Sequence, residues 1–431
     1  MNRATSSPMD PMHAWAKDLF PINRSITGPG IRRTLRYLAE LVPGLEIHEI
    51  PSGTSVFDWE IPPEWEVTEA WIEDAKGRRL VDWANHNLHL VGYSEAVDAM
   101  FTRDELESHL HSLPEQPDAI PYITSYYERR WGFCLAHRQR LSLPEGPFRV
   151  RIVSTLKPGS LTYAELRLRG ETDREILLST YVCHPSMGNN ELSGPVVTAA
   201  IARWLVGLPR RRYTYRILFL PETIGSIAYL SCHWQEMQAL TDAGFVLTCI
   251  GDERAYSYLD SRFGNSLADR AALHVLRHMV ERFDHYSFLD RGSDERQYCS
   301  PGIDLPVGSI MRSKYGTFPE YHTSLDDLSL ITPKGLQGGF EIVRETLGLL
   351  EANRLYRVVV KCEPQLGKRG LYPTLSTKET KQQVASMMNL LAFADGRHDL
   401  IAIAERIGVY AGEFLPVVER LLSDGLLEIQ E

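Results

Sequence analysis

Five residues with metal-binding or proton-transferring side chains stand at the ends of apolar runs or in the loops that follow. They are His184, Glu222, Asp252, Asp294 and His322. Imidazole nitrogens and carboxylate oxygens are ligands that zinc accepts, and a spare carboxylate can take a proton from water bound to the ion. The five residues are far apart in the chain, so their spacing defines no site. Their types predict a zinc-dependent hydrolytic centre if the fold brings them together.

The stretch from Ile176 to Ala200 positions the first of these residues. Residues 176–183 form an apolar, β-branched run, which is typical of a strand buried on both faces. Pro185 cannot continue a strand ladder, so we expect His184 at the carboxyl end of a sheet, where open α/β sheets bind ligands. A polar loop follows, and the residues from Pro195 onward have helical spacing.

Three of these candidates, His184, Glu222 and Asp252, could also have a purely structural role. A single histidine before a proline is often a partly buried residue satisfied by hydrogen bonds. Glu222 and Asp252 fit as caps of the helices that follow them. We expect Asp326 and Asp327 to cap or solvate the next helix.

Composition narrows the class of protein. The 431 residues are 43% hydrophobic and 24% charged, as in ordinary globular proteins, and no apolar run approaches the thickness of a bilayer. The net charge of −10 disfavours nonspecific binding to nucleic acids and acidic membranes. Six cysteines without a C-x-x-C pair predict reduced, mostly buried thiols. The first residues show no apolar signal segment, so we expect a cytoplasmic protein.

Two other kinds of active site find no support in the motifs. Ser193 and Ser226 lack the G-x-S-x-G elbow of serine hydrolases. The chain also has no P-loop and no G-x-G-x-x-G after a predicted strand. Metal-assisted hydrolysis therefore remains the favoured chemistry.

The pattern along the chain predicts several structural units. Residues 11–45 contain an amphipathic helical pattern. Residues 46–140 form short alternating segments rich in Trp and Tyr, which predicts a mainly β insertion whose aromatic residues form a core and whose rigid loops cover a pocket. From residue 148 to about 360, strands alternate with helices, which predicts a mixed or mainly parallel sheet with helices on both faces.

The last segment reads as helix, helix, turn, helix and short strand, the layout of a winged helix. The helix that would read a DNA groove carries three acidic residues, Glu413, Glu419 and Asp424, and one basic residue, Arg420. Helices that read DNA grooves need cationic side chains for the phosphates, so DNA binding is disfavoured. We expect this unit to serve packing or oligomerisation.

Several ordered motifs resemble one known family. They are NRSITGPG, DWEIPPEW, HPSMGNNELSG, LPETIGS, GDERAYSYLDSR, SDERQYCSPGIDLPV and YHTSLDD. Together they resemble bacterial aminopeptidase-like proteins related to zinc exopeptidases of the leucyl aminopeptidase and glutamate carboxypeptidase type. The resemblance covers nearly the whole chain. It implies an α/β fold with a zinc-exopeptidase-like mixed sheet sandwiched by helices (residues 1–45 and 141–362), an inserted β-rich domain (46–140) and a winged-helix domain (363–431).

The resemblance also assigns roles by position. His184 matches the first histidine ligand, Asp252 the carboxylate ligand after the third strand, and His322 the last histidine ligand. Glu222 matches the general base. Arg296 and Tyr321, with Asp294 beside them, are candidates for holding the substrate or stabilising an oxyanion.

Two positions depart from the family pattern. Asn190 stands where an aspartate bridges two metal ions, and a neutral amide cannot supply that charge. Thr223 follows Glu222 where a second acidic residue is expected. The resemblance therefore implies one zinc ion rather than two, with Glu191 as a substitute oxygen ligand.

These observations lead to one expectation and two alternatives. We expect a zinc-dependent aminopeptidase-like hydrolase that acts on a peptide or related amide, preferably a small substrate because the insertion narrows the cleft. We also expect a homo-oligomer and no membrane partner. One alternative is a catalytically impaired protein that uses the peptidase fold for binding, for which Asn190 is the motive. The other, a DNA-binding regulator, is less favoured.

Overall fold

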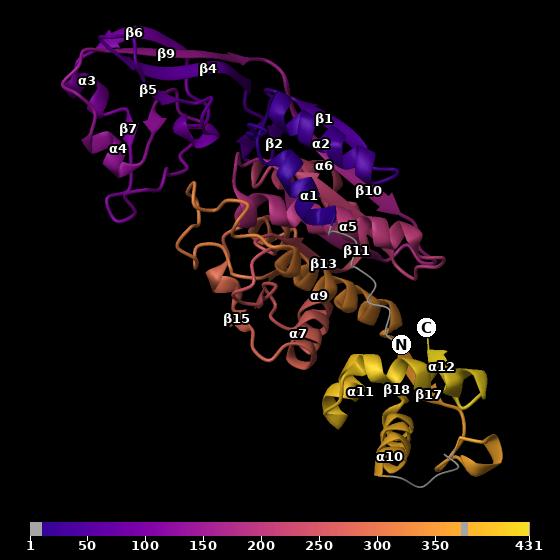
Figure 1. Cartoon of the computed structure of the whole chain (residues 1–431). Helices are drawn as coiled ribbons and strands as arrows, with labels where there is room; N and C mark the ends of the chain where they lie inside the picture. Colours follow the sequence, from indigo (N-terminus) through magenta and orange to yellow (C-terminus); the bar gives the residue numbers. More distant parts are fainter. Residues whose placement is uncertain (1–10, 372–377, 431) are drawn as a thin grey trace. The chain divides into compact units, whose positions relative to one another are not determined.

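The computed structural model describes residues 11–371 and 378–430, with side chains from residue 384 onward in the second range. Two compact units are present: one contains residues up to 268 together with 284–341, and the other contains residues 269–283 and those from 342 onward. Figure 1 traces the order of the elements along the chain. No helix within the described residues is both long enough and apolar enough to pass through a membrane.

An eight-stranded mixed sheet forms the centre of the first unit, as the alternation of strands and helices predicts. Its order is β1 (Glu46–Pro51), β10 (Ser160–Leu168), β12 (Thr214–Leu220), β11 (Glu175–Tyr181), β13 (Thr241–Leu247), β16 (Val307–Met311), β14 (Ser257–Leu259) and β15 (Asp284–Tyr286). Strands β12, β11, β13 and β16 are parallel. All residues of β11 and β12 are buried, so the apolar runs do lie inside a sheet covered on both faces.

The helices of the first unit are α1 (Pro11–Leu19), α2 (Pro29–Leu41), α5 (Ser193–Gly207), α6 (Ile224–Leu240) and α8 (Glu295–Tyr298). Helices α7 (Leu267–Met279) and α9 (Pro333–Ala352) lie mostly in the second unit. Helix α5 is apolar nearly all round, and ten of its 15 residues are buried, because it packs on β11, β12 and β13. Helices α5 and α6 begin near the carboxyl ends of β11 and β12, where His184 and Glu222 lie.

The insertion has its own sheet. Strands β5 (Arg79–Asp82), β4 (Glu64–Asp74), β9 (Phe148–Lys157) and β6 (Val97–Phe101) form it, and all of its neighbouring strands are antiparallel. Smaller elements complete it: the hairpin β2 (Ser55–Val56) and β3 (Trp59–Glu60), the pair β7 (Leu110–His111) and β8 (Phe133–Cys134), and the helices α3 (Arg103–Glu107) and α4 (His137–Leu141).

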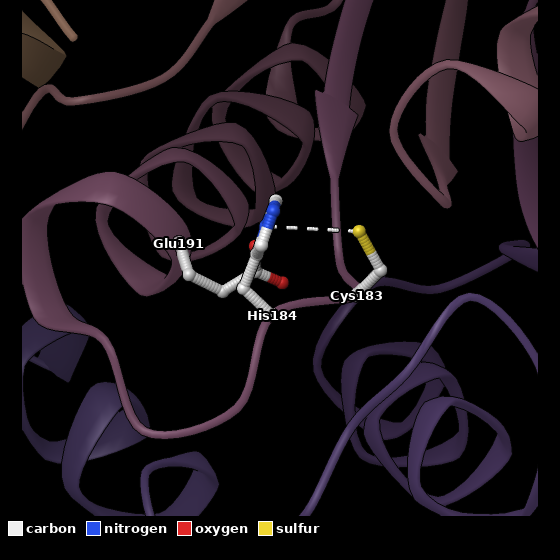
Figure 2. A group of neighbouring side chains, drawn as sticks. All are labelled: Cys183, His184 and Glu191. Carbon is white, nitrogen blue, oxygen red and sulfur yellow. Dashed lines mark hydrogen bonds and ion pairs between the residues drawn. The ribbon is translucent and has the colours of Figure 1, made fainter. Parts of the chain in front are cut away.

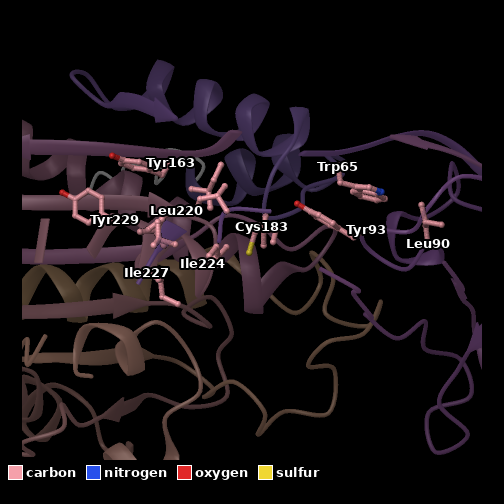
Figure 3. Close-up of a cluster of buried hydrophobic side chains, with 14 of the residues drawn as sticks. Trp65, Leu90, Tyr93, Tyr163, Cys183, Leu220, Ile224, Ile227 and Tyr229 are labelled. Carbon is pink, nitrogen blue, oxygen red and sulfur yellow. The ribbon is translucent and has the colours of Figure 1, made fainter. Parts of the chain in front are cut away.

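The boundary between the two sheets differs from the predicted one. Strand β1 lies inside the predicted insertion but pairs with β10 in the main sheet, whereas β9 lies after its predicted end and pairs with β4 and β6. The turn at residues 158–159 carries the chain from β9 to β10, from one sheet into the other. One buried apolar cluster joins the two sheets, running from Trp65 and Leu90 to Leu220 and Ile227 (Figure 3).

The second unit has the predicted winged-helix layout. It contains β17 (Leu355–Val358), α10 (Lys378–Phe393), β18 (Asp395–Asp399), α11 (Leu400–Ile407), α12 (Leu415–Ser423) and β19 (Leu427–Gln430), with β17 in the middle of an antiparallel three-stranded sheet. Within this unit the side chain of His274 binds both Glu405 and the backbone N–H of Ala411. On α12, Glu419 accompanies Arg420, whose guanidinium pairs with Asp424 at 2.8 Å.

A buried ionic cluster stabilises the main sheet. The guanidinium of Arg216 on β12 donates to both carboxylate oxygens of Glu175, at 2.8 and 3.0 Å, and these residues are 1% and 0% exposed. Tyr229 and Glu236 on α6 accept further hydrogen bonds from Arg216. Every group in the cluster depends on the central cation, because a buried carboxylate without a partner is strongly destabilising.

We expect Arg216→Met to lower the free energy of unfolding by about 3–5 kcal/mol, because the buried Glu175 carboxylate loses two of its hydrogen bonds and keeps only the half-exposed Arg167 as a cationic partner. Urea denaturation followed by circular dichroism measures this change. The matched control is Arg210→Met, which breaks the exposed pair between Arg210 and Glu171 and is expected to cost less than about 1 kcal/mol. Equal losses in the two variants would contradict the role of Arg216.

Candidate functional site

The loop after β11 is held in place by a residue far along the chain. Residues Gly188–Leu192 form a π-helical turn that leads into α5. Asp326 is fully buried, and its two carboxylate oxygens accept hydrogen bonds from the backbone N–H groups of Asn189 and Asn190 at 2.6 and 2.8 Å. The backbone N–H of Gly188 also donates to the Asp326 carbonyl oxygen. Asp326 therefore caps the turn that carries the candidate ligands.

The prediction that Asp326 caps or solvates the next helix is wrong. Thr332 has that role, because its hydroxyl accepts a hydrogen bond from the backbone N–H of Gly335 in the first turn of α9. Asp327 instead binds the backbone N–H and the hydroxyl of Ser329. Sequence proximity favoured a local cap, whereas the fold uses Asp326 for a contact across 137 positions of the chain.

His184 lies in a buried chain of charged groups. Its Nδ1 is 2.7 Å from a carboxylate oxygen of Glu191, and the other oxygen of Glu191 is 3.7 Å from Nε of Arg24 (Figure 2 shows His184 and Glu191). Arg24 also donates to the backbone carbonyl of His184 at 3.0 Å. Burial alone would lower the pKa of His184, but the adjoining Cys183 and Glu191 raise it by more, so the pKa is well above its ordinary value.

Glu222 faces the other ring nitrogen of His184. Its Oε2 is 3.6 Å from His184 Nε2, and its Oε1 accepts a hydrogen bond from the Ser293 hydroxyl at 2.8 Å. Burial raises the pKa of Glu222 above its ordinary value. A carboxylate fixed at one oxygen and with a raised pKa is suited to accept a proton at the other.

The predicted substrate residues Asp294 and Arg296 lie behind Glu222. Asp294 accepts hydrogen bonds from the backbone N–H of Thr223 and the hydroxyl of Ser226 at the start of α6. Burial raises its pKa to about 7. Arg296 donates to the Thr223 hydroxyl at 2.7 Å. These contacts hold the segment that carries Glu222, so Asp294 and Arg296 position Glu222.

His322 lies close to His184. The ring centroids of His322 and His184 are 5.5 Å apart, and Tyr321 stacks on His322 at 3.9 Å. Burial lowers the pKa of His322 to about 3, so its imidazole is neutral near pH 7 and available as a ligand. Within the described part of the chain, no hydrogen bond holds either nitrogen of this ring.

A segment of the insertion covers the two histidines. The ring of Tyr122 lies 5.0 Å from His184 and 5.3 Å from His322, measured between centroids. Its backbone N–H donates to the His322 carbonyl, and Pro121 forms a β-bridge with Thr323. The hydroxyls of Tyr122 and Tyr126 are hydrogen-bonded at 2.8 Å. A segment of the insertion therefore packs against both histidines and pairs with the backbone at His322.

Asp252 is engaged elsewhere. Its two oxygens accept four hydrogen bonds, from the backbone and hydroxyl of Ser313, the backbone of Arg254 and the side chain of Asn189. Asn190 is held by the Tyr181 hydroxyl at 3.0 Å. The structure therefore brings His184, Glu191, Glu222 and His322 together, whereas the carboxylate of Asp252 organises the neighbouring loops.

The donor set fits one zinc ion better on one face of His184 than on the other. Cys183 Sγ, a His184 ring nitrogen and a Glu191 oxygen lie within 4.8 Å of one another (Figure 2). The Arg24 cation adjoins this set and repels a second cation. Burial also raises the pKa of the Cys183 thiol to about 11, which disfavours the thiolate that would bind a metal ion. Glu222 lies 3.6 Å from Nε2 and His322 lies beside the ring, while Glu191 binds Nδ1, the kind of contact that orients a metal-bound histidine.

Strained backbone is concentrated around this site. The described non-glycine residues with positive φ include Ser186 (47°), Thr223 (65°), Cys249 (47°) and His322 (57°). Such conformations cost about 1–3 kcal/mol each and persist where surrounding contacts impose them. Their presence beside His184 and Glu222 marks this region as a functional site.

Sequence reasoning missed several residues that shape the site. Arg24, Tyr122 and Ser293 were not among the candidates, although NRSITGPG contains Arg24 and the aromatic insertion contains Tyr122. For Arg24 the composition of the motif gives no signal of burial, because half of its residues are polar. For Ser293 we find no signal in the sequence.

Comparison with known proteins gives a consistent picture. Residues 13–353 match the family described as a domain of unknown function, DUF4910, and residues 354–429 match a winged helix-turn-helix. A Clostridium acetobutylicum protein, whose description proposes polysaccharide biosynthesis and an aminopeptidase-like domain, is 43% identical over 413 residues and 94% of each chain.

Solved structures agree with this match. The crystal structure of a proposed peptidase from Clostridium acetobutylicum is 41% identical, with a TM-score of 0.92 over 97% of this chain and 96% of that one. A zinc aminopeptidase from Bacillus subtilis is 11% identical, with a TM-score of 0.56 over 80% of this chain and 96% of that one. The second likeness shows that the fold is aminopeptidase-like.

We expect Asp326→Asn to lower the free energy of unfolding by about 1–3 kcal/mol, because the amide leaves one buried N–H of the π-helical turn without an acceptor. Thermal and urea denaturation measure the loss. The adjacent variant Asp327→Asn serves as the control and is expected to cost less than about 1 kcal/mol, since Ser329 can bind water instead. A larger loss in the control would refute the assigned role.

Proposed function

We propose that this chain, which belongs to the DUF4910 family and ends in a winged helix-turn-helix domain, is a zinc-dependent hydrolase that cleaves an amide bond in a small substrate. The single observation that carries the proposal is the arrangement at His184. Glu191 binds Nδ1 at 2.7 Å, Glu222 lies 3.6 Å from Nε2, and the His322 ring lies 5.5 Å from the His184 ring between centroids. The aminopeptidase-like fold supports the same reading.

His184 and His322 would hold the ion, and one ion suits the residues better than two. Asn190 is neutral, and its side-chain oxygen already accepts a hydrogen bond from Tyr181. Asp252 is the carboxylate that the family resemblance assigns as a metal ligand. To bind the ion, it would have to give up one of the four hydrogen bonds that it accepts. When bound, zinc supplies Lewis acidity to the attacking water and to the substrate carbonyl.

The chain's own residues supply the proton transfer and the enclosure. Glu222 accepts the proton of the attacking water at Oε2 while Ser293 holds Oε1. Tyr122 and Tyr321 lie against the histidines, and burial raises the pKa of both phenols, so they stay protonated and can donate to a developing oxyanion. The closed cover formed by the insertion excludes long peptides.

The substrate class follows from two considerations. A closed site admits a small aminoacyl amide more readily than a folded peptide. The description of the Clostridium acetobutylicum relative proposes polysaccharide biosynthesis, and we therefore add acylated amino sugars, which also contain an amide bond, as a second candidate class. Both classes belong in the first activity screen.

We expect the purified full chain to contain about one zinc per chain, because two imidazoles and a carboxylate are a common zinc ligand set. His322→Ala should lose most of this zinc, whereas Cys183→Ala should retain it, since the Nε2 face of His184 holds the ion. Elemental analysis after dialysis against metal-free buffer measures the content. Loss of zinc from Cys183→Ala alone would place the ion on the Nδ1 face and contradict the proposed centre.

Glu222→Gln separates proton transfer from metal binding. We expect this variant to keep its zinc and to lose about 100-fold or more in kcat, because an amide cannot accept the proton. Initial rates on aminoacyl p-nitroanilides and N-acylated amino sugars, together with the zinc content, test the role. A zinc-loaded wild-type protein that hydrolyses neither class would instead favour a binding protein with a peptidase fold, the reading that Asn190 motivates.

A further inference from the structure

A second pocket, of about 310 Å³, lies between the start of α2 and the edge of β4 in the insertion. Residues of the loop before α2 line one side of it, and Trp65, Glu66 and Trp83 line the other. It is built by the NRSITGPG motif, which the proposed hydrolytic site uses only through Arg24. The other conspicuous residues of that motif remain without an assigned purpose.

Hydrogen-bond donors in this pocket lack acceptors. Ser25 is 6% exposed, and within residues 11–371 and 384–430 its hydroxyl has no hydrogen-bond partner. Nε1 of Trp83 is buried and likewise lacks an acceptor in these ranges. Arg33, an exposed residue on the first turns of α2, lines the pocket, and no ion pair to a described residue engages it. The two buried donors without acceptors, at Ser25 and Trp83, indicate a bound acceptor.

The helix end adds two more donors. Helix α2 has 13 residues, Gly28 as an N-cap without a side-chain cap, and Pro29 in its first turn. The backbone N–H groups of Gly30 and Ile31 therefore lie at an uncapped helix start, where the helix dipole favours an anion. Gly30 lines the pocket.

The two glycines are required by the packing of this loop. Gly28 has φ +99°, and a Cβ there would lie 2.3 Å from the Trp65 carbonyl oxygen. A Cβ on Gly30 would lie 1.8 Å from the Asn23 carbonyl oxygen. Side chains at either position would push the loop away from the helix start, so the glycines keep Ser25 and the helix N-terminus on one cavity.

The charge of the pocket favours an anion. Glu66 also lines it, but the Glu66 carboxylate pairs with Lys157 at 3.6 Å. Among the lining residues, no free carboxylate then neutralises Arg33 or the positive end of the helix dipole. A bound cation would find no free carboxylate among the lining residues.

We propose that this pocket binds a phosphoryl group, with Ser25, the helix N-terminus and Arg33 as its donors. A phosphate presents several acceptor oxygens in different directions, which suits donors that approach from a loop, a helix end and a long cationic side chain. The volume exceeds that of a phosphate ion, so the group belongs to a small organic phosphate or enters as free phosphate. This proposal does not depend on the proposed hydrolytic function.

The site is separate from the histidines but adjoins the same loop. Arg24, between the pocket residues Asn23 and Ser25, donates to the His184 carbonyl, and Asn87 of the pocket donates to the Ser186 hydroxyl. Zinc at His184 is therefore not needed for the pocket to bind an anion, and the two sites can be tested apart.

Isothermal titration calorimetry of the full chain with inorganic phosphate tests the proposal. We expect Arg33→Gln to weaken binding about tenfold or more and Ser25→Ala by a few-fold, since charged hydrogen bonds contribute more than neutral ones. The matched control Arg36→Gln removes the same charge from the same helix outside the pocket and should leave the affinity unchanged. Wild-type protein that binds no phosphate, or equal weakening in Arg33→Gln and Arg36→Gln, would overturn the proposal.

Two further arms identify the ligand and separate the sites. His322→Ala should bind phosphate like the wild type, and loss of binding in this variant would assign the anion to the histidine site and overturn the proposal. Glycerol 3-phosphate that binds more tightly than inorganic phosphate supports an organic phosphate as ligand, and equal affinities support free phosphate. Acetate bound as tightly as phosphate would refute the phosphoryl assignment.

Discussion

The candidate site depends on one buried ionic contact, between Glu191 and the two groups on either side of it. Glu191 fixes the ring of His184, and the Arg24 guanidinium compensates its charge. All three residues are at most 5% exposed, so each depends on the others: a charge left alone at this depth would destabilise the fold. This contact determines which nitrogen of His184 is free for chemistry.

The same contact explains why the loops around the site are assembled from distant segments. Arg24 comes from the loop before α2, His184 from the end of β11, and the turn that carries Glu191 is capped by Asp326. Strained residues at Ser186, Thr223 and His322 occur where these segments meet. Rigid positioning of this kind keeps a small set of polar groups oriented before a ligand arrives.

The insertion takes part in the candidate site. Its Tyr122 packs on both histidines, and its backbone pairs with the His322 segment, so the insertion forms a wall of the site as well as a separate sheet. Its other edge forms the donor-rich pocket with α2. The insertion thus contributes residues both to the surroundings of the two histidines and to the pocket beside α2.

The sequence by itself determined the alternation of strands and helices, the winged helix and the places of His184 and Glu222 after buried strands, because apolar periodicity and chain breaks are local properties. It did not determine that β1 joins the main sheet and β9 the sheet of the insertion, because strand pairing is a tertiary contact. The tertiary structure decided which side chains meet. Asp252 binds Ser313 and Asn189, Asp326 reaches back to the turn after His184, and Arg24 supports Glu191. Such contacts join segments more than 60 residues apart, and local patterns carry no information about which distant donor will reach a carboxylate.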